Sequence, residues 1–170
     1  LMAPKRLSEK LNQRIQQNAL RTIQVPDFEV DFFSNDYLGF AKNQEIVAAI
    51  DNLLVEKQIS TLGSTGSRLI SGNSEWIQQT EQYLAKYHQT EAALLFNSGY
   101  DANLGLLSSV PQKGDLVLYD ALVHASILDG IRLSHATAYK YPHLDDVVLE
   151  EMLQKFEHQY QHVYVVTESV

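Results

Sequence analysis

The feature that most constrains the fold is a regular alternation of short apolar runs with amphipathic stretches between residues 74 and 167. Helices are expected where apolar residues recur at helical spacing, over 74–88, 100–110, 124–135 and 145–157. Strands are expected where the apolar runs are short, over 92–96, 116–119, 137–141 and 163–167. Because crossovers between parallel strands are right-handed and helical, this order predicts an α/β fold with a mostly parallel sheet and flanking helices.

The residues before this pattern are organised differently. A polar amphipathic helix is expected over residues 1–22, and Pro26 interrupts the chain after it. Further expected elements are a short strand at 30–33, a helix at 44–57 and a long Gly/Ser/Thr-rich connection at 60–74. We therefore divide the chain into an N-terminal helix and short strand segment, 1–43, and a sheet-forming domain, 44–170.

Composition and charge exclude several classes of protein. The formal net charge of −8 and the scattered basic residues argue against a nucleic-acid binder. No apolar run approaches the length of a membrane span and no signal peptide is recognisable, so a cytoplasmic location is the default expectation. The chain has no cysteine, and His158 and His162, four residues apart, precede a strand rather than share a helix. We expect no metal site.

Polar groups follow three of the predicted strands. In open parallel sheets, ligands bind beyond the carboxyl ends of strands, where the next helices begin. Those positions hold Asn97–Tyr100, Asp120–His124 and Thr167–Glu168. The sequence therefore predicts a binding site at this edge of the sheet.

Two of these positions allow a functional and a purely structural interpretation. Gly99 would let the backbone approach a phosphate at the start of a helix, whereas Ser98 could simply cap that helix. His124 could act as a base or stack on an aromatic cofactor, or it could merely cap the following helix. Neither choice is decided by the residues alone.

The glycine-rich segment 63–68 has its own alternatives. It could be a flexible linker, but the apolar neighbours Leu62, Leu69 and Ile70 favour an ordered loop buried at a site or a subunit interface. Arg21 and Asn35 would count as surface residues on local pattern alone.

Several segments, taken in order, resemble the α-oxoamine synthases. The segments that carry the resemblance are Ser34-Asn35-Asp36-Tyr37-Leu38-Gly39, Gly63-Ser64-Thr65-Gly66-Ser67-Arg68, Phe96-Asn97-Ser98-Gly99-Tyr100-Asp101-Ala102-Asn103, Asp120-Ala121-Leu122-Val123-His124-Ala125-Ser126 and Val165-Val166-Thr167-Glu168-Ser169-Val170. They extend over residues 34–170 and follow the order and spacing of the family.

The resemblance implies the front part of the large domain of an aspartate-aminotransferase-like fold, a homodimer, and pyridoxal 5'-phosphate (PLP) as cofactor. It implies that His124 stacks on the pyridine ring and helps to position the substrate. It implies that Asn35 faces the amino-acid carboxylate and that Arg21 lies near the acyl substrate. The cofactor-binding residues that it implies are Ser98, Gly99, Tyr100, His124 and Glu168.

The resemblance also implies a reaction, the decarboxylative condensation of an amino acid with an acyl-CoA or acyl carrier thioester. Residues 97–103 look most like members that join alanine to a pimeloyl thioester for biotin-precursor synthesis; members that transfer an acetyl group to glycine are the alternative. The family's Schiff-base lysine and pyridine-nitrogen aspartate lie beyond Val170, so we expect these 170 residues alone to be inactive. A non-catalytic partner subunit and a phosphate-binding α/β module are the rival classes.

Overall fold

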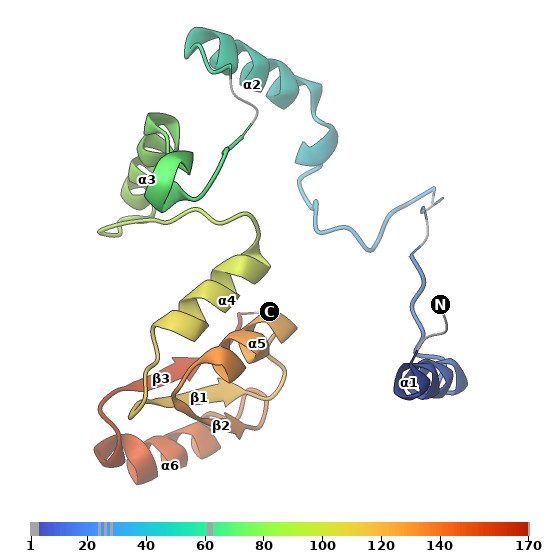
Figure 1. Cartoon of the computed structure of the whole chain (residues 1–170), viewed down its shortest axis with the longest axis vertical. Coiled ribbons are helices and arrows are strands. Elements are labelled where there is room, and N and C mark those ends of the chain that lie inside the picture. Colours follow the sequence, from blue (N-terminus) through green and yellow to red (C-terminus); the bar gives the residue numbers. More distant parts are fainter. Residues whose placement is uncertain (1–3, 24, 26, 28, 61–62, 170) are drawn as a thin grey trace. The chain divides into compact units, whose positions relative to one another are not determined.

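The computed structural model describes residues 4–23, 25, 27, 29–60 and 63–169 (Figure 1). Pro26 and Leu62, which the sequence analysis used, and Val170 lie outside the described residues. The chain divides into two compact units, Leu1–Leu62 and Gly63–Val170. The predicted domain division after residue 43 stays a prediction.

The first unit contains the helices α1 (Lys5–Gln16) and α2 (Gln44–Glu56). The helix predicted over 1–22 is too long, because the backbone turns left-handed at Asn18 (φ 52°). The N–H of Asn18 donates to the carbonyl of Ile15, an arrangement that closes a helix end.

The short strand predicted at 30–33 is wrong. The Asp31 carboxylate accepts the N–H groups of Phe33 (2.8 Å) and Ser34 (3.1 Å). Such a side-chain turn competes with a strand for backbone donors, and the described residues provide no neighbouring strand to pair with this segment.

The second unit confirms the predicted alternation except for the strand at 92–96. Its helices and strands, in chain order, are α3 (Glu75–His88), α4 (Gly99–Ser109), β1 (Leu116–Asp120), α5 (Ala125–Leu133), β2 (Thr137–Tyr141), α6 (Asp146–Phe156) and β3 (Val163–Val166). The strands form a parallel sheet in the order β2-β1-β3, with Leu116 opposite Thr137 on one side and Val163 on the other.

The core lies on both faces of β1. Leu116, Val117 and Leu118 are fully buried, and alternate side chains of a strand point to opposite faces. Val117 packs against buried residues that include Ile127 of α5, whereas Leu116 and Leu118 pack against α6. Figure 1 shows the resulting layers, with α4 and α5 on one face of the sheet and α6 on the other.

The strand predicted at 92–96 does not form. The N–H of Leu95 donates to the Glu81 carboxylate (2.8 Å) rather than to a neighbouring strand. Leu94 remains 64% exposed. The apolar composition of residues 92–96 suits a buried strand. A strand forms, however, only where a second strand accepts its hydrogen bonds.

No described helix is both long and apolar enough to cross a membrane. Nor do three or more His, Cys, Asp or Glu side chains of the described residues gather where they could hold a metal ion.

Candidate functional site

The candidate site lies at the edge of the sheet where β1 and β3 end. Because the two strands are parallel, their carboxyl ends meet at the same edge. The chain leaves β1 through the turn at 120–124 and leaves β3 toward Glu168, and α5 begins directly after the turn.

Asp120, at the end of β1, holds the turn in place. Its carboxylate is buried and accepts the N–H groups of Leu122 (2.8 Å) and Leu144 (3.1 Å), and it also pairs with Nδ1 of His143 (2.9 Å). These bonds, chiefly the one from Leu122, lower the pKa of Asp120. The ionised carboxylate therefore joins the turn to the loop after β2.

His124 follows the turn and is held from two sides. Its ring Nδ1 accepts the N–H of Ser126 (3.1 Å), so His124 caps α5. Its main-chain N–H donates to Oε2 of Glu168 (2.6 Å), 44 residues further along the chain. The capping interpretation is thus confirmed, and His124 and Glu168 are brought together; their roles toward a cofactor stay predictions.

The start of α4 has the form of an anion site. Ser98 caps it, since its hydroxyl oxygen accepts the N–H of Asp101 (3.1 Å). The N–H groups of Gly99 and Tyr100 belong to the first turn, where a helix offers no internal acceptor. A Cβ added at Gly99 would meet no atom within 4 Å. Packing within the chain therefore does not require glycine there, whereas a phosphate close to the backbone would.

Tyr100 connects the start of α4 to α5 and to His124. Its hydroxyl donates to the Asp129 carboxylate, which also accepts from Arg132 (3.0 Å). The ring of Tyr100 stands edge-on to that of His124, with centroids 6.0 Å apart and planes at 81°. The hydrogen bond to Asp129 is the main cause that raises the pKa of Tyr100. Tyr100 therefore stays a neutral donor at neutral pH.

The glycine-rich loop is held by hydrogen bonds of its own and is largely exposed in this single chain; its predicted burial at a site or a subunit interface stays a prediction. The hydroxyl of Ser64 lies within hydrogen-bond distance of the carbonyls of Gly66 (2.7 Å) and Gly72 (3.0 Å), which share its one hydrogen, and a Cβ at Gly72 would overlap this loop. Leu69 and Ile70, however, are 98% and 86% exposed. The loop lines an open depression of about 580 Å³ together with Asn97 and Asp101 near the start of α4.

Arg68, at the end of this loop, forms a bidentate ion pair with Glu81. Its guanidinium donates to both oxygens of Glu81 (2.7 and 2.9 Å) and to Asn73. The pair with Arg68, together with the N–H of Leu95, lowers the pKa of Glu81 to about 2. This bidentate contact fixes the loop to α3.

Arg21 and Asn35 both lie in the first unit and are exposed. Asn35 sits in the turn before Asp36, where its carbonyl accepts the N–H of Tyr37 (2.9 Å). The substrate-binding roles of Arg21 and Asn35 stay predictions.

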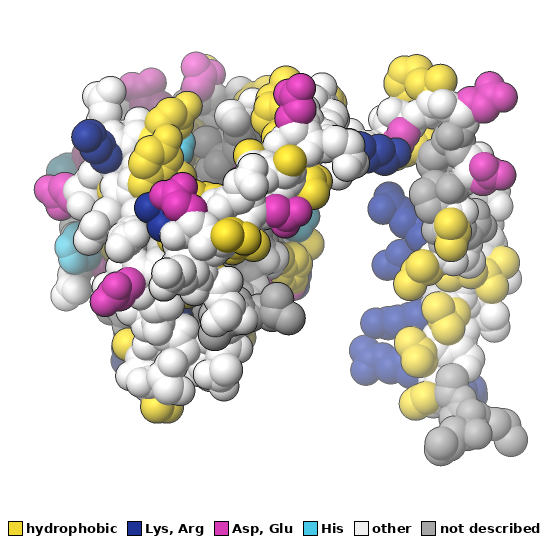
Figure 2. Space-filling view, turned by 90° about the horizontal axis from the view of Figure 1, so that it is seen from above, with side chains coloured by type: hydrophobic (Ala, Val, Ile, Leu, Met, Phe, Trp, Pro, Cys, Tyr) yellow, Lys and Arg dark blue, Asp and Glu magenta, His cyan; other side chains and the backbone are white. Residues whose placement is uncertain are grey.

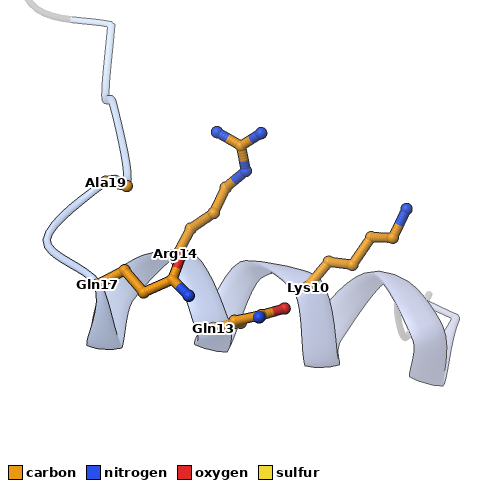
Figure 3. Close-up of a pocket in the computed structure, with 5 residues that line it drawn as sticks. All are labelled: Lys10, Gln13, Arg14, Gln17 and Ala19. Carbon is orange, nitrogen blue, oxygen red and sulfur yellow. The ribbon is translucent and has the colours of Figure 1, made fainter.

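A second hollow, of about 430 Å³, lies beside α1. Lys10 and Arg14 extend from the same side of the helix along it, with Gln13, Gln17 and Ala19 as the other lining residues (Figure 3). Figure 2 shows Lys and Arg side chains in a row along the segment at the right of the view, beside hydrophobic ones. Among the described residues, no carboxylate lines the hollow, and we assign no function to it.

Three polar residues of the site received no role from the sequence: Asp120, Asn103 and Ser126. All three lie within the segments quoted for the resemblance, which was the only signal available. Asn103 Nδ2 donates to the hydroxyl of Ser126 (3.0 Å), a side chain with no exposed surface. The contact between Asn103 and Ser126 depends on the close approach of α4 and α5, which no local pattern reveals.

Residues 29–170 match the family described as aminotransferase class I and II. The chain belongs to this family. The predicted resemblance to α-oxoamine synthases and the expected aminotransferase-like fold are both confirmed.

Curated relatives of the chain include 8-amino-7-oxononanoate synthases. The chain is 40% identical to 8-amino-7-oxononanoate synthase 2 of Bacillus subtilis, over 96% of this chain and 44% of the relative. It is 43% identical to 8-amino-7-oxononanoate synthase of Haemophilus ducreyi, over 83% of this chain and 37% of the relative. The chain thus spans less than half the length of the curated relatives it matches.

Solved structures of the family share the fold. Serine palmitoyltransferase of Sphingomonas wittichii has a TM-score of 0.67 and 32% identity, over 75% of this chain and 32% of that one. The crystal structure of 8-amino-7-oxononanoate synthase from Francisella tularensis has a TM-score of 0.58 and 30% identity, over 79% and 36%. A further chain, described as SPT with PLP, has a TM-score of 0.65 and 30% identity, over 74% and 31%.

Proposed function

We propose that the protein is a PLP-dependent acyltransferase that condenses L-alanine with a pimeloyl thioester, carried by CoA or by an acyl carrier protein. In this reaction the acyl–sulfur bond breaks and a carbon–carbon bond forms at the amino-acid Cα. The carboxylate leaves as CO2 and the carrier leaves as the free thiol. The product would be a precursor of biotin.

One observation carries the proposal. One edge of the sheet brings together Gly99 and Tyr100 at the start of α4, His124 at the start of α5 and Glu168 beyond β3. The chain that carries this arrangement has curated relatives named 8-amino-7-oxononanoate synthase. The solved relative described as SPT with PLP supports the choice of cofactor.

The residues at this edge fit PLP. The N–H groups of Gly99 and Tyr100 would donate to its phosphate, in the open space that a Cβ at Gly99 would fill. The flat ring of His124 would lie against the pyridine ring, with Glu168 holding the His124 backbone. When bound, PLP would stabilise the negative charge that develops at the amino-acid Cα.

Ser98 would contribute to this site indirectly. Its hydroxyl caps α4 and so orients the first-turn N–H groups that would bind the phosphate. We assign Asn35 to the substrate carboxylate and Arg21 to the acyl substrate. Both assignments rest on the family resemblance of the segments around them. We further propose that the protein works as a homodimer in the cytoplasm.

The alternative within the family is a glycine C-acetyltransferase. The names of the curated relatives favour the pimeloyl reaction, and the similarity to serine palmitoyltransferase indicates only a shared family chemistry. A non-catalytic partner subunit or a phosphate-binding module would hold an anion at the start of α4 without turnover.

The test uses the complete protein with PLP. We expect a visible absorbance band from the bound cofactor, a shift of that band on addition of alanine, and release of free thiol from pimeloyl thioester. Acetyl thioester with glycine is the matched comparison, and faster thiol release with that pair would favour the alternative. Absence of the band would contradict the whole proposal, and a band without turnover would indicate the partner subunit.

A further inference from the structure

The hydrogen bonds around the His124 ring define which of its nitrogens carries hydrogen. Nδ1 lies 3.1 Å from the main-chain nitrogen of Ser126, in a geometry where the N–H points at it. A backbone N–H can only donate, so Nδ1 must accept. The hydrogen of the neutral ring therefore resides on Nε2.

Two side chains support this state. The hydroxyl of Ser126 lies 2.8 Å from Nδ1, and it accepts from Nδ2 of Asn103 at 3.0 Å. Having accepted that hydrogen bond, the hydroxyl has its own hydrogen free to donate to Nδ1, where it shares the single lone pair with the Ser126 N–H. Ser126 has no exposed surface, so water does not compete for the hydroxyl. The result is a directed chain of hydrogen bonds from α4 through α5 to the ring.

Two other histidines of the chain are held in the opposite way. Nδ1 of His143 faces both oxygens of Asp120 (2.9 and 3.0 Å), and Nδ1 of His162 faces Asp115 (3.0 Å). A carboxylate lowered in pKa, as both are, can only accept. These two rings therefore carry hydrogen on Nδ1. His124 therefore differs from His143 and His162 in the nitrogen that carries hydrogen, and the difference comes from the groups that contact each ring.

We infer that Asn103 and Ser126 are positioning residues that hold His124 as the tautomer with hydrogen on Nε2. This ring offers a ligand an N–H donor at Nε2. It offers no lone pair there, so Nε2 cannot remove a proton from a substrate. The functional part of the inference rests on the proposed PLP site. Of the two chemical roles predicted for His124, a base or a ring that stacks on the cofactor, it favours the stacking ring, which donates a hydrogen bond from Nε2.

The test reads the tautomer directly. The complete protein, labelled with ¹⁵N-histidine and free of cofactor, is studied by long-range ¹H–¹⁵N correlation at about pH 9, where ordinary histidines are neutral. We expect His124 to show hydrogen on Nε2, and His143 and His162 to show hydrogen on Nδ1. Hydrogen on Nδ1 of His124 would overturn the inference.

Variants test the two supporting side chains. Asn103→Asp replaces the donor by an acceptor, so the Ser126 hydroxyl turns away from His124, and the fraction of ring with hydrogen on Nδ1 should rise several-fold. Ser126→Ala should raise it also. Asn12→Asp makes the same chemical change at an exposed position of α1 and should leave the ratio unchanged. An unchanged ratio in both Asn103→Asp and Ser126→Ala would remove the two residues from this role.

The His143 signals serve as the control for folding, because they depend on Asp120 and not on Asn103. The measurement needs no PLP. A failure of the proposed function would therefore appear as a missing absorbance band with the tautomers as expected, whereas a failure of this inference would appear in the histidine spectrum alone.

Discussion

At the scale of single residues, the site depends on groups that are held by several partners at once. His124 is fixed through its ring by Ser126 and through its backbone by Glu168. The side chain itself remains exposed, so the ring is oriented without being covered. This combination suits a residue that must meet a ligand in one orientation.

His124→Ala should therefore affect turnover far more than folding. If the proposed function holds, we expect turnover of the complete protein with PLP, alanine and pimeloyl thioester to fall about 100-fold or more, the size of effect seen when a reacting group is misplaced. Loss of the α5 cap should lower the free energy of unfolding by urea by only about 1 kcal/mol. His135→Ala, at an exposed histidine in the same region of the chain, is the control. Near-normal turnover in the His124 variant would remove it from the mechanism.

Glu81 predicts a pH dependence of stability. Because its pKa in the folded protein is about 2, below its ordinary 4.5, its contribution is present above about pH 4.5 and is lost as the pH falls toward 2. Glu81→Gln should lower the urea midpoint at neutral pH, and the difference from the wild type should shrink at about pH 3. The control is Glu151→Gln on the exposed face of α6. A difference that is the same at both pH values would contradict the assigned pKa.

At the scale of elements, α4 and α5 pack closely against each other. A Cβ at Gly130 of α5 would lie 2.8 Å from Cβ of Leu107 and 3.0 Å from the carbonyl of Asn103. The glycine lets the two helices approach, and this approach brings Asn103 within reach of Ser126. Gly130 thus accounts both for the packing of the two helices and for the hydrogen bonds from Asn103 through Ser126 to His124.

Gly130→Ala should separate the two helices. Overpacking of this kind costs about 1–3 kcal/mol, measured as the loss in free energy of unfolding by urea. Gly99→Ala, where the added methyl group meets no atom, should change the free energy of unfolding by less than about 0.5 kcal/mol in the cofactor-free protein. Equal losses in the two variants would show that the helices do not pack as described.

The elements differ in how well the sequence predicts them. The helices after residue 74 and the strands around Leu116, Thr137 and Val163 form where expected, because helical spacing and buried apolar runs are local signals. The segments 30–33 and 92–96 have a suitable composition, but neither finds a neighbouring strand among the described residues. Strand pairing is a long-range property, and no window of sequence contains it.

At the scale of the whole molecule, the order of strands and helices locates the site. A parallel arrangement of β1 and β3 requires their carboxyl ends to lie together, so His124 and Glu168 meet although 44 residues separate them. The sequence was sufficient to predict that the residues after β1 and after β3 lie at the same edge of the sheet. The partners that orient each side chain, such as Asp120 with His143, could not be predicted, because they depend on how the loops after different strands pack.

The central claim is that this edge of the sheet holds PLP, and a crystal structure of the complete protein grown with PLP tests it most directly. We predict the phosphate within hydrogen-bond distance of the N–H groups of Gly99 and Tyr100 and the pyridine ring stacked against the imidazole of His124. Cofactor bound elsewhere, or a start of α4 filled by the protein's own side chains, would contradict the account.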